Sequence, residues 1–138
     1  MSHELKQVDV RLKLTDKESV FSREVIDTPE KAVSVLAPVL AELDREEVCV
    51  VNLDGKGRPI NFNTSFVTGR ELYKSAILSN AAAMIMLHNH PSSDLKMSMS
   101  DRNITEKMMY AGILLDIDFY DHIIVAGRTG ELFSMREN

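Results

Sequence analysis

An uncharged apolar run at residues 81–87 leads directly into His88-Asn89-His90-Pro91. The run is too short to cross a bilayer, and its length suits a buried strand. Side chains two positions apart on an extended chain point to the same face, so both imidazoles can converge on one point. Pro91 cannot donate to a strand ladder. The run therefore predicts a buried strand that ends at Pro91, with two histidines at its exit.

A helix start follows this strand. Ser98-Met99-Ser100-Asp101 has the S-x-x-D form of a capped helix, and the pattern predicts an amphipathic helix from Asp101 that Gly112 closes. Asp101 then lies in the first turn, where a carboxylate suits the helix dipole and can point back at the strand exit. Each feature alone has an ordinary explanation, because Ser98 can serve only as a cap and Asp101 only as a first-turn charge.

His88, His90 and Asp101 together are two imidazoles and one carboxylate. Three protein ligands fit a catalytic zinc centre, in which water takes the fourth position. A structural zinc normally has four protein ligands, and the single Cys49 cannot supply a set of thiolates. The same ligands also suit iron or manganese. The H-E-x-x-H helix of other metalloproteases and the H-x-E with P-C-x-x-C of zinc deaminases are both absent from the sequence.

The order H-x-H-P, seven intervening residues, Ser, then x-x-D resembles the JAMM motif of the MPN/JAB metallopeptidases. The match to the RadC branch of that family covers roughly residues 29–136. Ser93, Met97 and Gly69 depart from the branch, which usually has Gly, Pro and Pro there, and these departures concern loop shape and substrate fit more than metal binding. The segments that carry the branch resemblance are Asn80 to Ala83, Ile104-Thr105, Asp121 to Val125, and Arg70-Glu71 followed by Ala76.

The resemblance implies an α/β fold with three α-β-α layers around a mixed central sheet, as in JAB/MPN and cytidine-deaminase-like domains. We expect residues 29–138 to form this domain, and residues 1–28 to form an N-terminal strand and linker packed on the domain or on a partner. The patterns predict these elements: strands at 8–14, 48–53, 58–67, 116–120, 122–126 and 131–135, and helices that start at Pro29, with Pro38 as a candidate kink, and at Arg70, the latter running to Ala82.

Three metal ligands do not break a bond without a base. In the JAMM family this base is a Glu at the start of the strand after the first helix, and the family pattern places it at Glu46, with Glu47 as the alternative. The family resemblance also gives the hydroxyl of Ser98 the role of steadying the oxyanion beside the metal. For His122, a buried and hydrogen-bonded histidine is a better expectation than a fourth ligand.

Composition narrows the function classes. The chain has 138 residues, is 44% hydrophobic and carries a net charge of -5, so we expect one domain without strong intrinsic nucleic-acid binding. We expect no signal peptide, no membrane span and none of the helix-hairpin-helix DNA-binding segment that RadC proteins usually carry ahead of this domain. One cysteine favours a cytoplasmic location. An oligomer is compatible with the sequence.

The leading hypothesis is a zinc-dependent hydrolase of peptide or isopeptide bonds, acting on a peptide or protein substrate. The alternative is a non-catalytic or weakly catalytic accessory factor in DNA repair or mobile-element biology, as the historical use of the RadC label suggests. A complete ligand set together with a retained Glu favours catalysis, since an accessory factor does not need the base.

Overall fold

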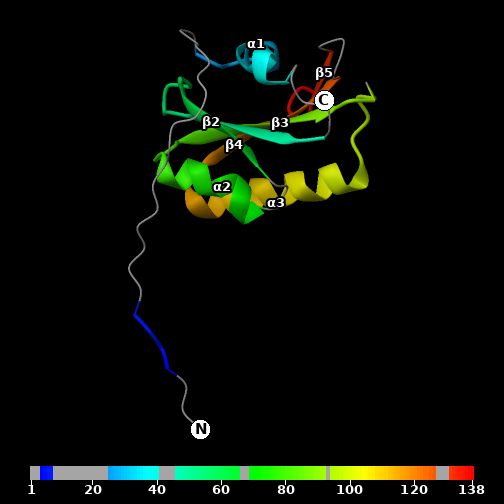
Figure 1. Cartoon of the computed structure of the whole chain (residues 1–138). Helices are drawn as coiled ribbons and strands as arrows, with labels where there is room; N and C mark the ends of the chain where they lie inside the picture. Colours follow the sequence, from blue (N-terminus) through cyan, green and yellow to red (C-terminus); the bar gives the residue numbers. More distant parts are fainter. Residues whose placement is uncertain (1–3, 8–24, 41–45, 66–68, 93, 127–130) are drawn as a thin grey trace.

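The structure, a computed structural model, describes residues 4–7, 25–40, 46–65, 69–92, 94–126 and 131–138. Within these residues, five strands form one sheet in the order β2-β1-β3-β4-β5 (Figure 1). The parallel pair is β3 and β4, and the other neighbours are antiparallel. The elements are α1 (Pro29–Leu40), β1 (Val48–Leu53), β2 (Pro59–Ser65), α2 (Gly69–Leu78), β3 (Ala83–His90), α3 (Met99–Leu115), β4 (Asp118–Ala126) and β5 (Leu132–Ser134).

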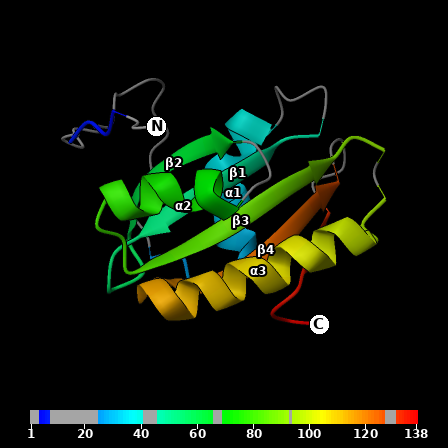
Figure 2. The ribbon, with the colours of Figure 1, turned by 90° about the horizontal axis from the view of Figure 1, so that it is seen from below.

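Helices cover both faces of the sheet. Figure 1 shows α1 on one side and α2 with α3 on the other, and Figure 2 shows α3 running beneath β3 and β4. The strands alternate accordingly: Leu87 of β3 packs in the cluster that contains α1, whereas Met86 packs in the cluster that contains α2 and α3. The predicted three-layer arrangement around a mixed sheet is confirmed.

The first helix begins where the sequence predicts. The Thr28 hydroxyl accepts the N–H of Lys31 at 3.2 Å, and Pro29 occupies the first helical position. The helix buries Leu36 and Leu40 against the sheet and continues past Pro38 to Leu40. The cap and the apolar face therefore fix where α1 lies.

The hairpin between β1 and β2 reaches back toward the chain segment before α1. Gly57 has a φ of 79°, and its carbonyl accepts the N–H of Ile26 at 2.9 Å. Ile26 is 1% exposed and packs in the core on the α1 side. The predicted strand at residues 8–14 and the last two residues of the predicted strand at 58–67 lie outside the described residues.

The strand β3 lies between β1 and β4, and all eight of its residues are buried. It ends at His90, immediately before Pro91, as the sequence predicts. The sequence predicts two strand segments after α3, at 116–120 and 122–126, but β4 is continuous, because Asp121 pairs with Ile85. Tyr120 is an extra residue opposite the step from Met84 to Ile85. This bulge interrupts the alternation with a period of two on which the sequence interpretation depends.

Helices α2 and α3, which cover the face of the sheet opposite α1, both end at residues other than the predicted ones. Helix α2 ends at Leu78 rather than Ala82, because Asn80 turns the chain at a φ of 53°. Helix α3 does not end at Gly112: it continues to Leu115, and Asp116 supplies the left-handed residue, with a φ of 57°. Gly112 instead permits a close approach, since a Cβ there would lie 2.5 Å from the Ile117 carbonyl oxygen.

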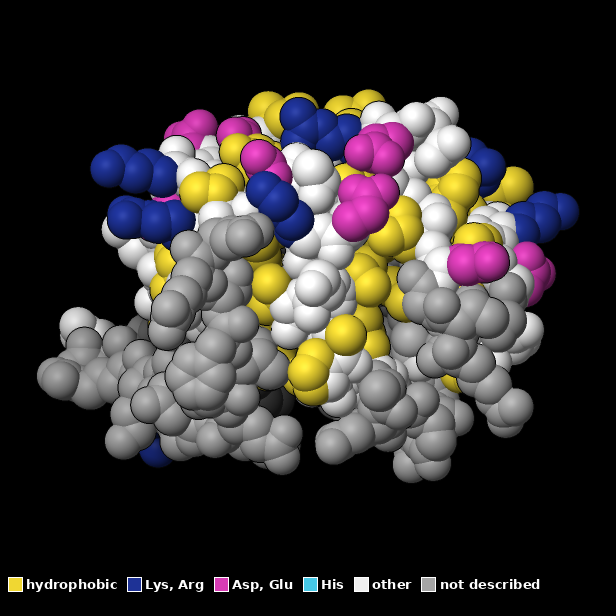
Figure 3. All heavy atoms as spheres, turned by 90° about the horizontal axis from the view of Figure 1, so that it is seen from above, with side chains coloured by type: hydrophobic (Ala, Val, Ile, Leu, Met, Phe, Trp, Pro, Cys, Tyr) yellow, Lys and Arg dark blue, Asp and Glu magenta, His cyan; other side chains and the backbone are white. Residues whose placement is uncertain are grey.

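The surface of the α1 face carries both signs of charge. Figure 3 shows basic and acidic side chains interspersed with apolar ones on this side, so the described charged residues of this face lie in small, mixed groups.

In the part of the chain that the structure describes, no helix combines the length and the apolar character needed to cross a membrane.

Replacing Gly112 by Ala tests the close approach. Alanine favours a helix over glycine by about 1 kcal/mol, but the added Cβ would lie 2.5 Å from the Ile117 carbonyl oxygen and 2.8 Å from the Tyr73 hydroxyl. We expect Gly112→Ala to lower the free energy of unfolding in urea by about 1–3 kcal/mol. Gly69→Ala is the matched control, because a methyl group added at that position meets nothing within 4 Å. Equal stability of the two variants would contradict the packing argument.

The start of α3 gives a second test. The Ser98 hydroxyl accepts the N–H of Asp101 at 3.0 Å, and the Asp101 carboxylate accepts the N–H of Ser98 at 2.9 Å. Ser98→Ala leaves one donor unsatisfied and should cost about 1 kcal/mol of unfolding free energy. Ser98→Thr keeps the acceptor oxygen and should lose much less. Thermal unfolding of the three proteins checks this, and an unchanged midpoint in Ser98→Ala would show that the cap contributes nothing.

Candidate metal centre

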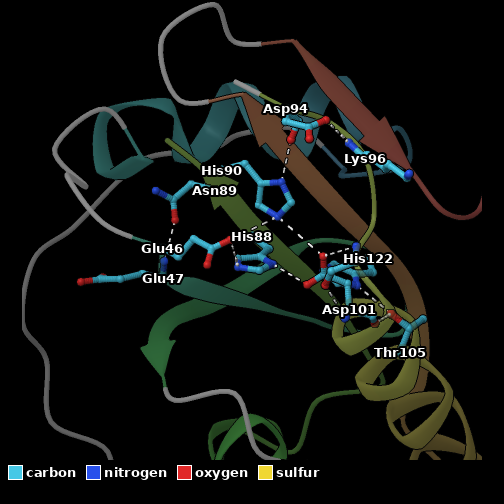
Figure 4. A network of polar contacts seen from close by, with 11 residues as sticks. Glu46, Glu47, His88, Asn89, His90, Asp94, Lys96, Asp101, Thr105 and His122 are labelled. Atoms are coloured by element: carbon cyan, nitrogen blue, oxygen red, sulfur yellow. Dashed lines mark hydrogen bonds and ion pairs between the residues drawn. The ribbon is translucent and has the colours of Figure 1, made fainter. Parts of the chain in front are cut away.

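The end of β3 presents its two histidines to α3. Because Met84 and Met86 face the cluster on the α2 and α3 side, His88 and His90 continue along that face. Asp101 lies in the first turn of α3 and points back at them (Figure 4). The rings of His88 and His90 are nearly perpendicular, with centroids 4.8 Å apart. The predicted ligands therefore meet at the C-terminal end of the central strand β3.

The register between β1 and β3 brings Glu46 to the same place. Val48 pairs with His88, and the Glu47 carbonyl accepts the N–H of Asn89, so Glu46 lies opposite His90. Its Oε1 is 3.6 Å from Nε2 of His88 and 3.4 Å from Nε2 of His90. The Glu46 side chain is 60% exposed. The candidate base thus lies on the solvent side of the histidine pair.

Glu47 belongs to the other face of the strand. Figure 4 shows its side chain directed away from His88. Its backbone N–H donates to the Oδ1 of Asn89 at 2.7 Å, and Asn89 is 1% exposed. This hydrogen bond fixes the chain next to Glu46, a role for Asn89 that the sequence interpretation missed. An amide residue between two candidate ligands, facing the opposite side of the strand, was the available signal.

Asp101 is held as a carboxylate. Its Oδ1 lies 3.1 Å from Nδ1 of His88, and its Oδ2 lies 3.6 Å from Nε2 of His90. Burial would raise the pKa of Asp101, but the hydrogen bonds from Ser98 and the nearby His88 and His122 lower it more, so this pKa falls below its ordinary value. The ionised form is the one that binds a metal.

The tautomer of His90 follows from its hydrogen bond. Nδ1 lies 2.6 Å from the Asp94 carbonyl oxygen, and a carbonyl can only accept, so Nδ1 carries the proton. In the neutral ring the buried Nε2 then presents a lone pair, and it has no hydrogen-bond partner among the described residues. Carboxylate oxygens of Glu46 and Asp101 lie 3.4 and 3.6 Å away. A lone pair facing two carboxylates is repulsive unless a cation lies among them, so these residues fit a divalent metal ion.

His88 has one ring nitrogen on each side of the cluster. Its Nε2 faces Glu46 and its Nδ1 faces Asp101. Burial lowers the pKa of His88, and this effect outweighs the opposite influence of the Asp101 carboxylate. The neutral imidazole that results is the form that binds metal ions.

His122 lies deeper than the predicted ligands. It is 0% exposed, and burial lowers its pKa to about 4. Its Nδ1 is 2.7 Å from the Thr105 hydroxyl, which also lies 2.7 Å from the Asp101 carbonyl oxygen. The prediction of a buried, hydrogen-bonded histidine is confirmed. Thr105 had no predicted role, although its position four residues after Asp101 places it on the same face of α3.

In the part of the chain that the structure describes, two overlapping groups of potential ligands result, each with its ligand atoms within 4.8 Å of one another. One consists of Glu46, His88 and His90, and the other of His88, Asp101 and His122. The predicted ligand set of two histidines and Asp101 spans both groups. Ser98 caps α3 through Asp101, and its role toward an oxyanion stays a prediction.

Comparisons with known proteins identify the family of this chain. The profile of the RadC-like JAB domain family matches residues 26–138. A protein named UPF0758 from Rubrobacter xylanophilus is 35% identical, over 99% of this chain and 68% of its own length. Proteins of the same name from Roseiflexus castenholzii and Methanosarcina mazei are 35% and 36% identical, over 95% and 72% of this chain.

Those last two relatives are longer proteins. The matched regions make up 58% and 47% of their lengths, so this chain spans about half of such relatives. The match over residues 26–138 takes in β3, α3 and the candidate centre between them. The chain belongs to the RadC-like JAB domain family.

Proposed function

We propose that the protein is a zinc-dependent hydrolase of peptide or isopeptide bonds. The observation that carries this proposal is the buried Nε2 of His90, which has no hydrogen-bond partner within the described ranges and faces Glu46 and Asp101 beside the second imidazole. His88, His90 and Asp101 would hold the ion. A two-histidine, one-carboxylate set leaves room for water, as a catalytic zinc site requires.

The chemistry divides between the ion and the chain. A bound zinc ion lowers the pKa of a coordinated water to about 7 and polarises a carbonyl. Glu46 would accept the proton of the attacking water and deliver it to the leaving nitrogen, for which its exposed position next to both histidines suits it. Ser98 would donate its hydroxyl hydrogen to the developing oxyanion, because its oxygen accepts from Asp101 N–H and leaves that hydrogen available.

The choice between an enzyme and an accessory factor depends on Glu46. An accessory protein could retain the buried ligands to stabilise its fold, but a mostly exposed Glu46 contributes little to stability there. Its position opposite His90 supports a chemical role. The substrate would be a peptide or protein whose scissile amide reaches this exposed side of the centre.

Removing the ion should have two effects. A zinc ion at 100 times its Kd would stabilise the protein by about 2.7 kcal/mol, so chelation should lower the melting temperature, and added Zn²⁺ should restore it. Hydrolysis of a fluorogenic library of peptides and Lys-linked isopeptides should stop and recover in parallel. In His90→Gln, Zn²⁺ should raise the melting temperature far less. Undiminished hydrolysis by metal-free protein would rule out the proposal.

Replacing the base separates chemistry from binding. Glu46→Gln should lower kcat by about 10²- to 10⁴-fold, because the variant loses proton transfer, while metal content by elemental analysis stays the same. Glu47→Gln is the matched control, since that side chain points away from the histidines, and it should retain near-normal turnover. Equal activity of the two variants would show that Glu46 is not the base.

A further inference from the structure

His122 and His90 have the same arrangement of hydrogen bonds around their rings. Each has its Nδ1 engaged by an oxygen and its Nε2 buried without a hydrogen-bond partner among the described residues. Histidines that bind metals characteristically donate their other ring N–H to a nearby acceptor, which fixes the ring and the tautomer. His122 therefore shares with a predicted ligand the features that prepare an imidazole for an ion.

The hydrogen bonds around Thr105 determine the tautomer of His122. The Thr105 hydroxyl has one hydrogen, and it donates that hydrogen to the Asp101 carbonyl oxygen at 2.7 Å. The same oxygen must then accept the N–H of His122 Nδ1, also at 2.7 Å. Nε2 of His122 is consequently a lone-pair acceptor, fully buried, with no donor in the described part of the chain.

A bulge directs this ring toward the centre. Phe119 packs on the α2 and α3 side, and strict alternation would place His122 on the opposite side. The extra residue Tyr120 reverses the alternation, so His122 stacks at 21° to the His88 ring with centroids 6.0 Å apart. A ring nitrogen of His122 thus comes within 4.8 Å of ligand atoms of His88 and Asp101.

We propose that His88, Asp101 and His122 form an inner position for a divalent cation, alternative to the outer position that His88, His90 and Asp101 would form beside Glu46. The inner position is closed: its three residues are 8%, 6% and 0% exposed. A neutral imidazole has one lone pair, so His88 serves one position at a time, through Nδ1 toward Asp101 or Nε2 toward Glu46. An ion at the inner position is held without the base beside it.

This proposal extends the proposed metal centre but does not depend on hydrolysis, and its test uses no substrate. Protein labelled with ¹⁵N-histidine is titrated with Zn²⁺, and long-range proton–nitrogen NMR spectra follow each ring nitrogen. The decisive sample is His90→Ala, which lacks the outer position. Here we expect one bound ion per chain and a move of the His122 Nε2 signal from a free lone-pair nitrogen to a metal-bound one.

Two further variants keep the test decisive. If His90→Ala does not fold, His90→Gln replaces it, because it removes the same imidazole and keeps a larger side chain in its place, and the same change of the His122 signal is required. In the double variant His90→Ala, His122→Gln, zinc affinity should fall at least tenfold relative to His90→Ala. A His122 Nε2 signal that stays unbound at saturating Zn²⁺, or no zinc binding by folded His90→Ala, overturns the inner position, and neither result bears on whether the wild-type centre hydrolyses peptides.

Discussion

The centre depends on the antiparallel register between β1 and β3. With Val48 opposite His88, the same register brings Glu46 opposite His90. A shift by one residue would put Glu47 opposite His90 and would turn the Glu46 carboxylate to the other face of the sheet. The hydrogen bond from the Glu47 N–H to Asn89 holds this end of the ladder. Strand pairing alone therefore places the candidate base Glu46 beside the two imidazoles.

Burying several imidazoles and a carboxylate is costly unless each polar atom finds a partner. Neighbouring groups supply many of these partners through hydrogen bonds: the Ser98 N–H to Asp101, the Asp94 carbonyl to His90, and the Thr105 hydroxyl to His122. Nε2 of His90 and Nε2 of His122, which have no such partner among the described residues, both belong to this cluster. The satisfied polar atoms are thus those that orient the side chains, and the unsatisfied nitrogens are those that we propose as ion ligands.

The sequence predicted the features that depend only on the spacing of residues within one element. A strand period of two placed His88 and His90 together, and the capping box placed Asp101 in the first turn. The rules failed where tertiary packing overrides them. The sequence pattern predicts a helix end at Gly112, although the missing side chain there makes room for the Ile117 carbonyl. A strand period of two does not predict the bulge at Tyr120, which turns His122 toward the same cluster. The hydrogen bond between Thr105 and His122 joins a helix to the strand that follows it, and the spacing within either element could not reveal it.

The exposure of Glu46 has an evolutionary consequence. Its side chain is 60% exposed, whereas those of His88 and His90 are 10% exposed at the end of a fully enclosed strand. Selection for folding therefore constrains the imidazoles but hardly constrains the glutamate. If the chain acts as proposed, a descendant that exchanged this one carboxylate would keep its architecture and the proposed ion ligands but lose the reaction, so an inert copy could arise by a single step that leaves no structural trace.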